Sequence, residues 1–260
     1  MTRFTHVDAL TGCYVISLRP VGGHAALRRA AALHSARVLA LSPWRLVGRD
    51  DAGTRAGLHK ALAIPRVVFT SPAAVRAASN LQVLQSRNDQ VFIGFGDGTA
   101  RALRRAGASQ VTSPSRMDSE GVLALPVLRE VQGRDVGLVT APGGRGRIAT
   151  ALAGRGARVL RADVYARVAV EPPARAVACL QRLQAPLLLA LSSGEALERI
   201  LELLPEPAVA RLRQARVLAA SDRLARLARE LGFTDLVVAN DARPASLLSA
   251  AVGAARAGAG

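Results

Sequence analysis

Short apolar runs alternate along this chain with longer segments in which Leu, Ala and Val recur at helical spacing. The stretch VVFTSPAAVRAA (67–78) is a strand-like run followed at once by a small-residue helix, and LLLALSSGEALERI (187–200) repeats the pattern. Continuous runs of four to seven apolar residues indicate strands that are buried on both faces, as in parallel sheets covered by helices. The pattern therefore predicts a parallel α/β fold.

In both stretches, a pair of hydroxyl residues lies between the strand and the helix. Ser71 and Ser193 are the second members of these pairs. Free backbone N–H groups and the positive end of the helix dipole meet at such junctions, so the junctions favour anions. The same serines are also suited to capping the helices, and the two roles are compatible.

Three segments in one half of the chain have counterparts in the other half. The aligned segments are 14–41 with 136–163, 67–78 with 189–200, and 95–111 with 219–236. The matched positions are separated by 121 to 125 residues in every case. Three matches in the same order and at nearly the same spacing predict two α/β units of one design, with a ligand cleft between them. Pro43 and the segment 164–173 are interpreted as extended connectors, since Pro172 and Pro173 disfavour a helix.

The charge of the chain favours an anionic ligand over a cationic one. The formal net charge is +16, and the basic residues are 34 Arg and the single Lys60. This ratio, together with abundant Ala, Gly and Pro, indicates coding bias, so the charge is weak evidence for a nucleic-acid partner. Aromatic residues, which stack on bases, make up only 3% of the chain, and we expect no nucleic-acid partner.

Cysteine and histidine usage excludes several kinds of site. Cys13 and Cys179 lie far apart and outside any CxxC spacing, which is typical of a reducing compartment rather than of a disulfide framework or a zinc module. The histidines, which do not have ligand spacing and predict no shared metal site, are His6, His24, His34 and His59. No apolar run reaches the ~20 residues that span a bilayer, and no signal peptide is evident. We expect a soluble, cytoplasmic protein with no membrane partner.

Two competing functions follow from the sequence. The first is a nucleotide-dependent oxidoreductase, because the segment GFGDG (94–98) is similar to the start of a dinucleotide fingerprint. Thr99, however, stands where the last glycine of the fingerprint is required. No acidic residue ends a strand about 20 positions further on, because Asp118 and Glu120 lie in a loop or helix start. The second is a two-domain protein that binds a small anion without catalytic activity. This alternative is not excluded by the sequence, and it predicts a ligand pocket that contains no proton donor.

An ordered set of motifs resembles the uroporphyrinogen-III synthase family over nearly the whole chain. In chain order the motifs are ISLRP, FTSPAAV, GDGTARALRRAG, MDSEGVLALP, GGRGRIATALAGRGA followed by VYAR, LSSGEAL and ASDRLARLARELGF. The resemblance implies two similar parallel-sheet α/β domains, flavodoxin-like or Rossmann-like, joined by two extended linkers. One domain would comprise 1–42 plus 171–260 and the other 48–163, with linkers at 43–47 and 164–170. Periodicity alone would instead give a tandem split near residue 130.

The resemblance also implies an activity, a substrate and partners. Enzymes of this family convert the linear tetrapyrrole hydroxymethylbilane to uroporphyrinogen III without a cofactor. The terminal hydroxyl leaves as water, ring D is inverted through a spiro intermediate, and the macrocycle closes. The substrate carries eight carboxylates, which suits helix amino ends and Arg. Transient contact with hydroxymethylbilane synthase is implied, and we expect a monomer because no heptad repeat or long apolar edge strand predicts an interface.

The motif VYAR places the family's linker tyrosine at Tyr165. Its implied role is to donate a hydrogen bond or a proton to the departing hydroxyl, which leaves an azafulvenium cation on the substrate. A phenol keeps its proton at neutral pH and so can serve as this donor. The other interpretation of Tyr165 is a linker aromatic packed against one domain.

The same motifs assign residues for substrate binding. They are Arg19, Ser71, Thr99, Gly143, Gly144, Arg145, Ser193 and Ser221. Thr99 matches the threonine of the family's G..TA motif, whereas Leu224 stands at that position in the second copy and leaves Ser221 as the nearest hydroxyl. Each Arg has the alternative of a solvated surface residue. Ser119 and Glu120 match the family's SE pair and are interpreted as an N-cap and a helix-start acid.

Overall fold

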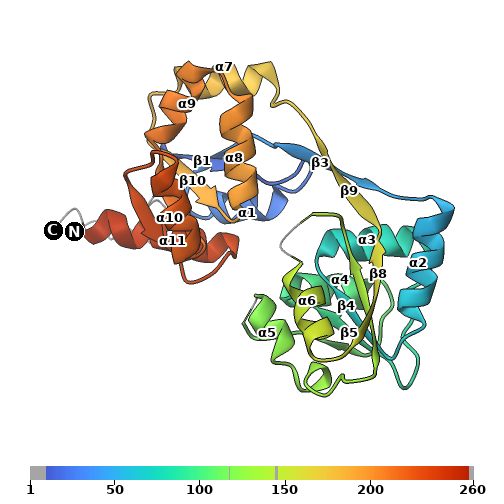
Figure 1. The fold of residues 1–260 in the computed structure, drawn as a ribbon. Helices are drawn as coiled ribbons and strands as arrows, with labels where there is room; N and C mark the ends of the chain where they lie inside the picture. The colour runs from blue at the N-terminus through green and yellow to red at the C-terminus, as the bar shows by residue number, and fades with distance from the viewer. Residues whose placement is uncertain (1–9, 117, 144–145, 258–260) are drawn as a thin grey trace. The chain divides into compact units, whose positions relative to one another are not determined.

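A computed structural model of the chain describes residues 10–116, 118–143 and 146–257. The contacts divide the chain into two compact units (Figure 1). Unit 1 comprises Met1–Arg45 and Ala169–Gly260, and unit 2 comprises Leu46–Val168. A tandem split near residue 130 would therefore cut through unit 2.

Unit 2 is built on a parallel five-stranded sheet with the strand order β6-β5-β4-β7-β8. Its strands are β4 (Arg66–Phe69), β5 (Val91–Gly94), β6 (Val111–Thr112), β7 (Asp135–Thr140) and β8 (Arg158–Asp163). Its helices are α2 (Ala52–Leu62), α3 (Pro72–Leu81), α4 (Asp97–Arg105), α5 (Ser119–Leu123), the 3₁₀ turn η1 (Pro126–Leu128) and α6 (Arg147–Gly154).

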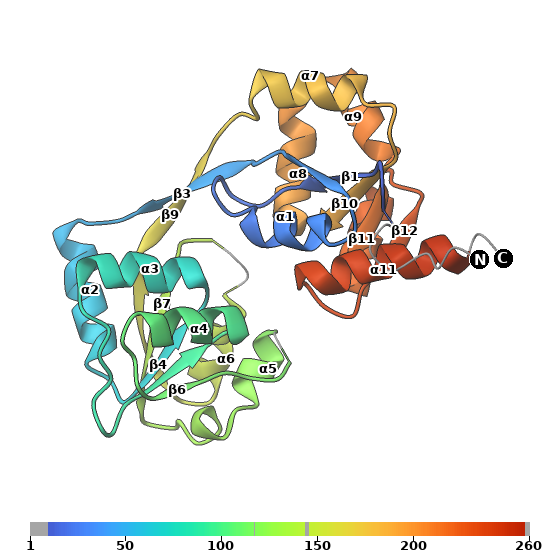
Figure 2. The same cartoon turned by 180° about the vertical axis from the view of Figure 1, so that it is seen from behind.

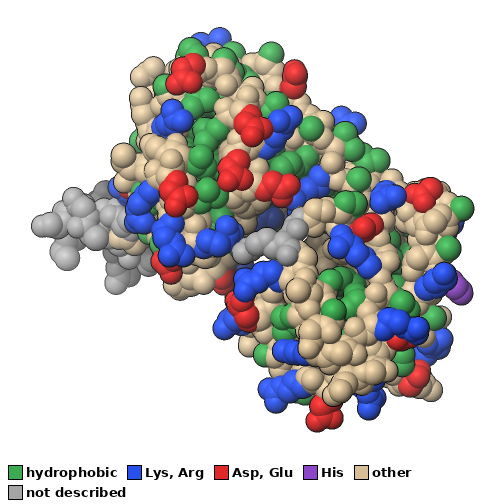
Figure 3. Space-filling model, in the orientation of Figure 1, with side chains coloured by type: hydrophobic (Ala, Val, Ile, Leu, Met, Phe, Trp, Pro, Cys, Tyr) green, Lys and Arg blue, Asp and Glu red, His purple; other side chains and the backbone are tan. Residues whose placement is uncertain are grey.

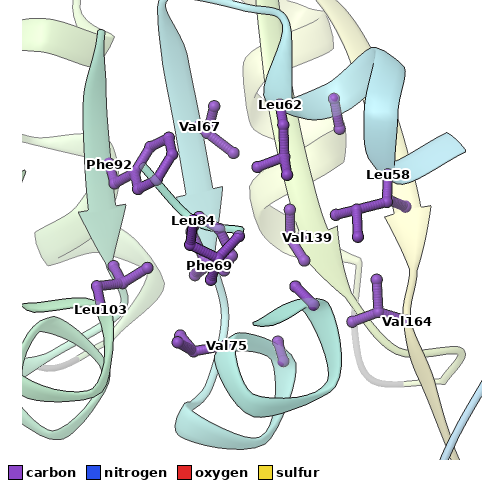
Figure 4. Packing of buried hydrophobic residues seen from close by; sticks show 14 of the residues in the cluster. Leu58, Leu62, Val67, Phe69, Val75, Leu84, Phe92, Leu103, Val139 and Val164 are labelled. Carbon is purple, nitrogen blue, oxygen red and sulfur yellow. The ribbon is translucent and has the colours of Figure 1, made fainter. Parts of the chain in front are cut away.

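Helices cover both faces of this sheet, as its continuously apolar strands predict. Figure 2 shows α2, α3 and α4 together on one face. Their apolar side chains pack on strand residues such as Phe69 and Phe92, whose ring centroids are 5.4 Å apart (Figure 4). On the opposite face, α5, η1 and α6 pack on alternate residues of the same strands, including Val68 and Ile93. The alternation places successive strand residues in two separate cores.

Unit 1 has a second parallel five-stranded sheet, with the order β12-β11-β10-β1-β2. Its strands are β1 (Tyr14–Ser17), β2 (Arg37–Ala40), β10 (Leu187–Leu191), β11 (Arg216–Ala219) and β12 (Leu236–Val238). Its helices are α1 (Ala25–Ala32), α7 (Ala174–Arg182), α8 (Gly194–Leu203), α9 (Glu206–Arg213), α10 (Asp222–Glu230) and α11 (Pro244–Ala257). Residues of α1 and α11 form one apolar cluster on this sheet.

The two sheets confirm the internal repeat. When β10 is matched to β4, β11 to β5, β12 to β6, β1 to β7 and β2 to β8, the two strand orders become identical. These are the pairings that the aligned segments predict. The units differ in chain order, because unit 1 is assembled from both ends of the sequence and unit 2 from its middle. The predicted pair of parallel α/β domains is thereby confirmed.

The chain passes between the units through two extended strands. β3 (Trp44–Gly48) and β9 (Tyr165–Ala169) pair as a two-stranded sheet. The N–H of Arg49 bonds the carbonyl of Val164 at 2.9 Å, and the N–H of Val170 bonds that of Pro43 at 3.1 Å, which makes the pair antiparallel. Pro173 lies after β9 and occupies the N-cap position of α7. The two prolines at 172–173 disfavour helix before this point, as the sequence predicts. No helix within the described residues is both long and apolar enough to span a membrane.

Candidate functional site

Each sheet has a point at which the strand order reverses. In unit 2 the chain runs outward from β4 to β6 and then returns to β7 on the other side of β4. The helices that follow β4 and β7 therefore cover opposite faces of the sheet and diverge at the strand carboxyl ends. Ligands of α/β proteins bind at such reversal points. The equivalent point in unit 1 lies between β10 and β1.

Two threonines join the strands at the reversal point of unit 2. Thr70 directly follows β4 and Thr140 ends β7, and their hydroxyl oxygens are 2.9 Å apart. The N–H of Thr70 also donates to the carbonyl of Val139 at 3.1 Å. The sequence pattern marks Thr70 only as a member of a hydroxyl pair and gives no sign of Thr140, because their pairing depends on the strand order.

Tyr165 and Ser71 meet at the same edge. The phenol oxygen of Tyr165 lies 3.2 Å from the hydroxyl oxygen of Ser71, and either atom can be the donor. Ser71 is the N-cap of α3 and accepts the N–H of Ala74 at 3.1 Å. That bond occupies one lone pair of the Ser71 oxygen and leaves its proton free. When Ser71 donates to Tyr165, the phenol proton is free to point at a ligand.

The ring of Tyr165 is buried with the apolar cluster of unit 2. Only 7% of Tyr165 is exposed, and it belongs to the same cluster as Phe69, Val139 and Val164. One end of the Tyr165 side chain is therefore packed in the apolar cluster, and the other end contacts the hydroxyl of Ser71. A ring fixed by packing holds its hydroxyl in one place, which suits a proton donor.

Thr99 lies in the first turn of α4, next to the start of α3. It is 4% exposed, and its hydroxyl has no hydrogen-bond partner among the described residues. A Cβ added at Gly98 would lie 3.8 Å from Cγ of Pro72, so the amino ends of α4 and α3 are neighbours. Two helix amino ends side by side concentrate free N–H groups at this edge.

The glycine-rich turn after β7 lies partly outside the described residues. Gly143 has a φ of +83°, which suits glycine and agrees with the tight turn that the sequence predicts. Gly144 and Arg145 lie outside the described residues. The predicted N-cap at Ser119 is wrong, because Asp118 caps α5 by accepting the N–H of Gly121 at 2.7 Å. Both residue types cap helices, and the carboxylate also gains from the dipole at this end.

Unit 1 repeats the hydroxyl caps at its own strand carboxyl edge. Ser193 caps α8 and Ser221 caps α10, and each accepts an N–H from three residues further on at 3.4 Å. A Cβ added at Gly194 would collide with the side chain of Leu227, so α8 and α10 lie against each other where they begin. Leu224, which is the counterpart of Thr99 in the internal repeat, is 3% exposed and is an apolar side chain of the unit 1 core.

Most Arg side chains are spread over the surface among other residue types (Figure 3). Several form local ion pairs, such as Arg158 with Asp135 and Arg216 with Asp235. Arg19, which follows β1 at the reversal point of unit 1, is different. It is partly buried, burial lowers its pKa, and its guanidinium has no acidic or hydrogen-bond partner among the described residues. An unpaired, partly desolvated guanidinium favours an anionic ligand.

A buried polar cluster next to Arg19 was not predicted. It consists of Ser17, His24 and Ser42, with His24 hydrogen-bonded to both serines. The sequence shows only an isolated histidine before a helix, and the cluster exists because β1 and β2 end side by side. Among the described residues, no three His, Cys, Asp or Glu side chains gather as metal ligands would.

Surface hollows also occur away from these edges. One of about 360 Å³ is bordered by Arg116, Glu120 and Pro126, and one of about 260 Å³ by His59, Gln90 and Phe92. Neither is lined by Tyr165 or Ser71.

Comparison with known proteins identifies the family. Residues 25–249 match the sequence model of the family described as uroporphyrinogen-III synthase HemD. The curated uroporphyrinogen-III synthase of Escherichia coli K12 is 33% identical over 161 residues, and that of Salmonella typhimurium LT2 is 34% identical over 161 residues. Each alignment covers 61% of this chain and 65% of the relative, which is just under two thirds of the relative's length.

Solved structures agree at the level of the fold. A mutant uroporphyrinogen III synthase from the extremely thermophilic bacterium Thermus thermophilus aligns with a TM-score of 0.58 at 19% identity, over 95% of this chain and 99% of that one. The uroporphyrinogen-III synthetase of Helicobacter pylori 26695 aligns with a TM-score of 0.61 at 12% identity, over 94% and 99% of the two chains. With a family match that spans most of its length, this chain belongs to the uroporphyrinogen-III synthase family.

Proposed function

We propose that the chain is a uroporphyrinogen-III synthase, which converts hydroxymethylbilane to uroporphyrinogen III with loss of water. The observation that carries this proposal is the contact of 3.2 Å between Tyr165 and Ser71 at the reversal point of a sheet, in a chain of this family. The contact supplies a buried, oriented proton donor next to helix amino ends. A site that only holds an anion does not require such a donor.

Substrate binding would use the anion-favouring groups at the two strand carboxyl edges. The substrate's carboxylates would accept hydrogen bonds from free N–H groups at the starts of α3, α4, α8 and α10. Hydroxyls of Ser71, Thr99, Ser193 and Ser221 border these helix starts, and Arg19 provides a full charge in unit 1. Dipoles and hydroxyls hold carboxylates without burying a matching number of full charges. Gly143, Gly144 and Arg145 would extend the unit 2 edge in the same manner.

Tyr165 would assist departure of the substrate's terminal hydroxyl. The C–O bond breaks with its electron pair going to oxygen, and the phenol proton converts the departing group to water. The remaining carbon is then part of a resonance-stabilised azafulvenium cation. Ring D attacks this cation through the carbon that already carries its bridge to ring C, which gives the spiro intermediate. The original bond between ring D and that bridge then breaks and leaves a second azafulvenium cation on ring C. The other α carbon of ring D attacks this second cation and closes the macrocycle with ring D inverted. The proton lost from the closing pyrrole carbon balances the proton given to the hydroxyl and restores the phenol.

The overall reaction requires no cofactor on chemical grounds. Loss of water and formation of a carbon–carbon bond leave the oxidation level of the tetrapyrrole unchanged. We therefore propose a cofactor-independent lyase whose rate is unaffected by chelators or by added nucleotides. We also propose that the protein works in the cytoplasm as a monomer and receives its unstable substrate in transient contact with hydroxymethylbilane synthase.

A coupled assay tests the activity. Hydroxymethylbilane is generated in place, the protein is added, the products are oxidised, and the type I and type III uroporphyrin isomers are separated by chromatography. Spontaneous closure gives type I, so each reaction contains its own reference. Type III product that persists in EDTA and without added nucleotide supports the proposal. Type I product alone, from protein with a folded circular dichroism spectrum, would support the non-catalytic anion-binding alternative.

A further inference from the structure

Three buried polar side chains join the ends of two strands in unit 1. Ser17 ends β1, His24 directly precedes α1, and Ser42 follows β2. Their exposed fractions are 0%, 6% and 6%. His24 Nδ1 lies 2.8 Å from the oxygen of Ser17, and His24 Nε2 lies 2.9 Å from the oxygen of Ser42. Both ring nitrogens of His24 are therefore bonded away from solvent.

The direction of each hydrogen bond in this cluster follows from one fixed point. The hydroxyl of Ser42 donates to the backbone carbonyl of Arg19 at 2.7 Å, since a carbonyl can only accept. Ser42 has no second proton, so it accepts from Nε2–H of His24. A neutral imidazole carries one N–H, and Nδ1 of His24 must then accept from Ser17. The chain of donors thus runs from Ser17 through His24 and Ser42 to the carbonyl of Arg19.

The neutral ring agrees with the electrostatics of the cluster. Burial, and then the positive charges of Arg28 and Arg19, lower the pKa of His24 below its usual value. A protonated ring would place a third positive charge beside these two arginines. It would also present two N–H groups, so that Ser17 would have to reverse its hydroxyl.

The cluster ends on the turn that carries Arg19. Beyond Arg19, this turn is tight, because the N–H of Gly23 bonds the carbonyl of Pro20 at 2.8 Å, and a Cβ at Gly23 would lie 3.0 Å from that oxygen. The N–H of Val21 bonds the carbonyl of Trp44 at 3.0 Å. The guanidinium of Arg19 itself has no partner among the described residues. Its backbone is therefore held by the cluster, while its charged end is left for a ligand.

We infer that His24 is a positioning residue, which acts through Ser42 on the Arg19 backbone and holds the Arg19 guanidinium for a carboxylate of the substrate. The inference rests on the proposed function for the identity of the substrate. His24 does not touch the reacting atoms. Because a carboxylate distant from the reacting carbon is bound equally before and during the reaction, loss of His24 should raise KM and leave kcat nearly unchanged.

A double-mutant cycle tests this inference in the isomer assay. Replacing Arg19 (Arg19→Ala) should raise KM by roughly tenfold, the effect of losing one charge-assisted hydrogen bond. His24→Ala should raise KM by a similar or smaller factor, and adding it to Arg19→Ala should have no further effect. His24→Gln, which keeps a donor for Ser42, should restore most of the affinity. His59→Ala, an exposed histidine in unit 2, serves as the matched control.

Two results would overturn the inference. One is a wild-type KM in the folded His24→Ala protein, and the other is full additivity of the His24 and Arg19 substitutions. If wild-type protein makes no type III product, the proposed function fails, and the same cycle is read from the Kd of uroporphyrin III, a stable octacarboxylate. Non-additive loss of uroporphyrin binding would still support the inference, and additive or absent effects would contradict it. The ¹⁵N spectrum of histidine-labelled protein should independently show His24 as the Nε2–H tautomer.

Discussion

The phenol oxygen of Tyr165 lies 3.2 Å from the hydroxyl oxygen of Ser71, although 94 residues separate the two positions. Ser71 caps α3 and is held there by the N–H of Ala74, while Tyr165 is held by apolar packing. The pair therefore joins a structural cap to the candidate proton donor that the family motifs assign. Loss of the Tyr165 hydroxyl should therefore affect the reaction rate, whereas loss of the Ser71 hydroxyl should affect both rate and stability.

Removing the Tyr165 hydroxyl should slow formation of uroporphyrinogen III. Tyr165→Phe keeps the buried ring and deletes the proton donor, so we expect kcat to fall by about 100-fold, the lower end of general-acid effects. Tyr14→Phe is the matched control, because Tyr14 is the other tyrosine of the chain and its hydroxyl accepts a hydrogen bond from Arg37 at 3.1 Å on the exposed surface of unit 1. Equal rates for the two variants would remove Tyr165 from the mechanism.

Ser71 should contribute to both stability and rate. Ser71→Ala deletes the N-cap of α3, and we expect the free energy of unfolding to fall by about 1 kcal/mol in a denaturant titration. It also deletes the partner of Tyr165, so kcat should fall as well. Ser71→Thr keeps both functions and should stay near wild type. Ser79→Ala, an exposed serine on the same helix, should change neither quantity.

Stability should depend on the protonation of His24. Since its folded pKa lies below the unfolded value, its contribution is fully present above about pH 6.5 and is lost as the pH falls from there through the folded pKa. The free energy of unfolding is measured from about pH 8 to about pH 5 for wild type and His24→Gln. The difference between the two proteins should shrink on acidification. A difference that does not change with pH would contradict a buried neutral ring.

Two glycines of unit 2 should respond differently to substitution by alanine. A Cβ at Gly137 in β7 would collide with the carbonyl oxygen of Ala61, which belongs to α2. Gly137→Ala must push α2 off the sheet, and we expect a loss of about 2 to 4 kcal/mol. Gly154 at the end of α6 faces open space, so Gly154→Ala should be neutral or stabilise by up to about 1 kcal/mol. Similar unfolding midpoints for both variants would show that the contact between β7 and α2 is not tight.

The sequence predicted those features that repeat or that depend on neighbours in the chain. The hydroxyl caps at Ser71 and Ser193 follow directly from the junction of an apolar run with a helix, and the structure has both. Ser221 also caps a helix, although the sequence marked it only as the hydroxyl nearest to Leu224. The internal repeat predicted two sheets of equal design because strand order is preserved even when the chain order is permuted. At Ser119 the same local pattern predicted the wrong N-cap, because the neighbouring Asp118 is equally suited to this position and caps α5 instead.

The features that the sequence did not predict depend on strands brought together by the fold. Thr70 and Thr140 pair only because β4 and β7 are neighbours in the sheet. His24 bonds Ser17 and Ser42 only because β1 and β2 end at one edge. A histidine before a helix carries no local signal for such a cluster. The carbonyl of Arg19, which accepts from Ser42, fixes the direction of the hydrogen bonds in this cluster.

The central claim is tested most directly by the isomer composition of uroporphyrin formed from hydroxymethylbilane. The measurement compares the type III fraction with and without this protein, at times shorter than spontaneous closure. The account predicts that type III becomes the main isomer when the protein is present, and that Tyr165→Phe returns most of the product to type I. Type I as the main isomer in the presence of folded wild-type protein would contradict it.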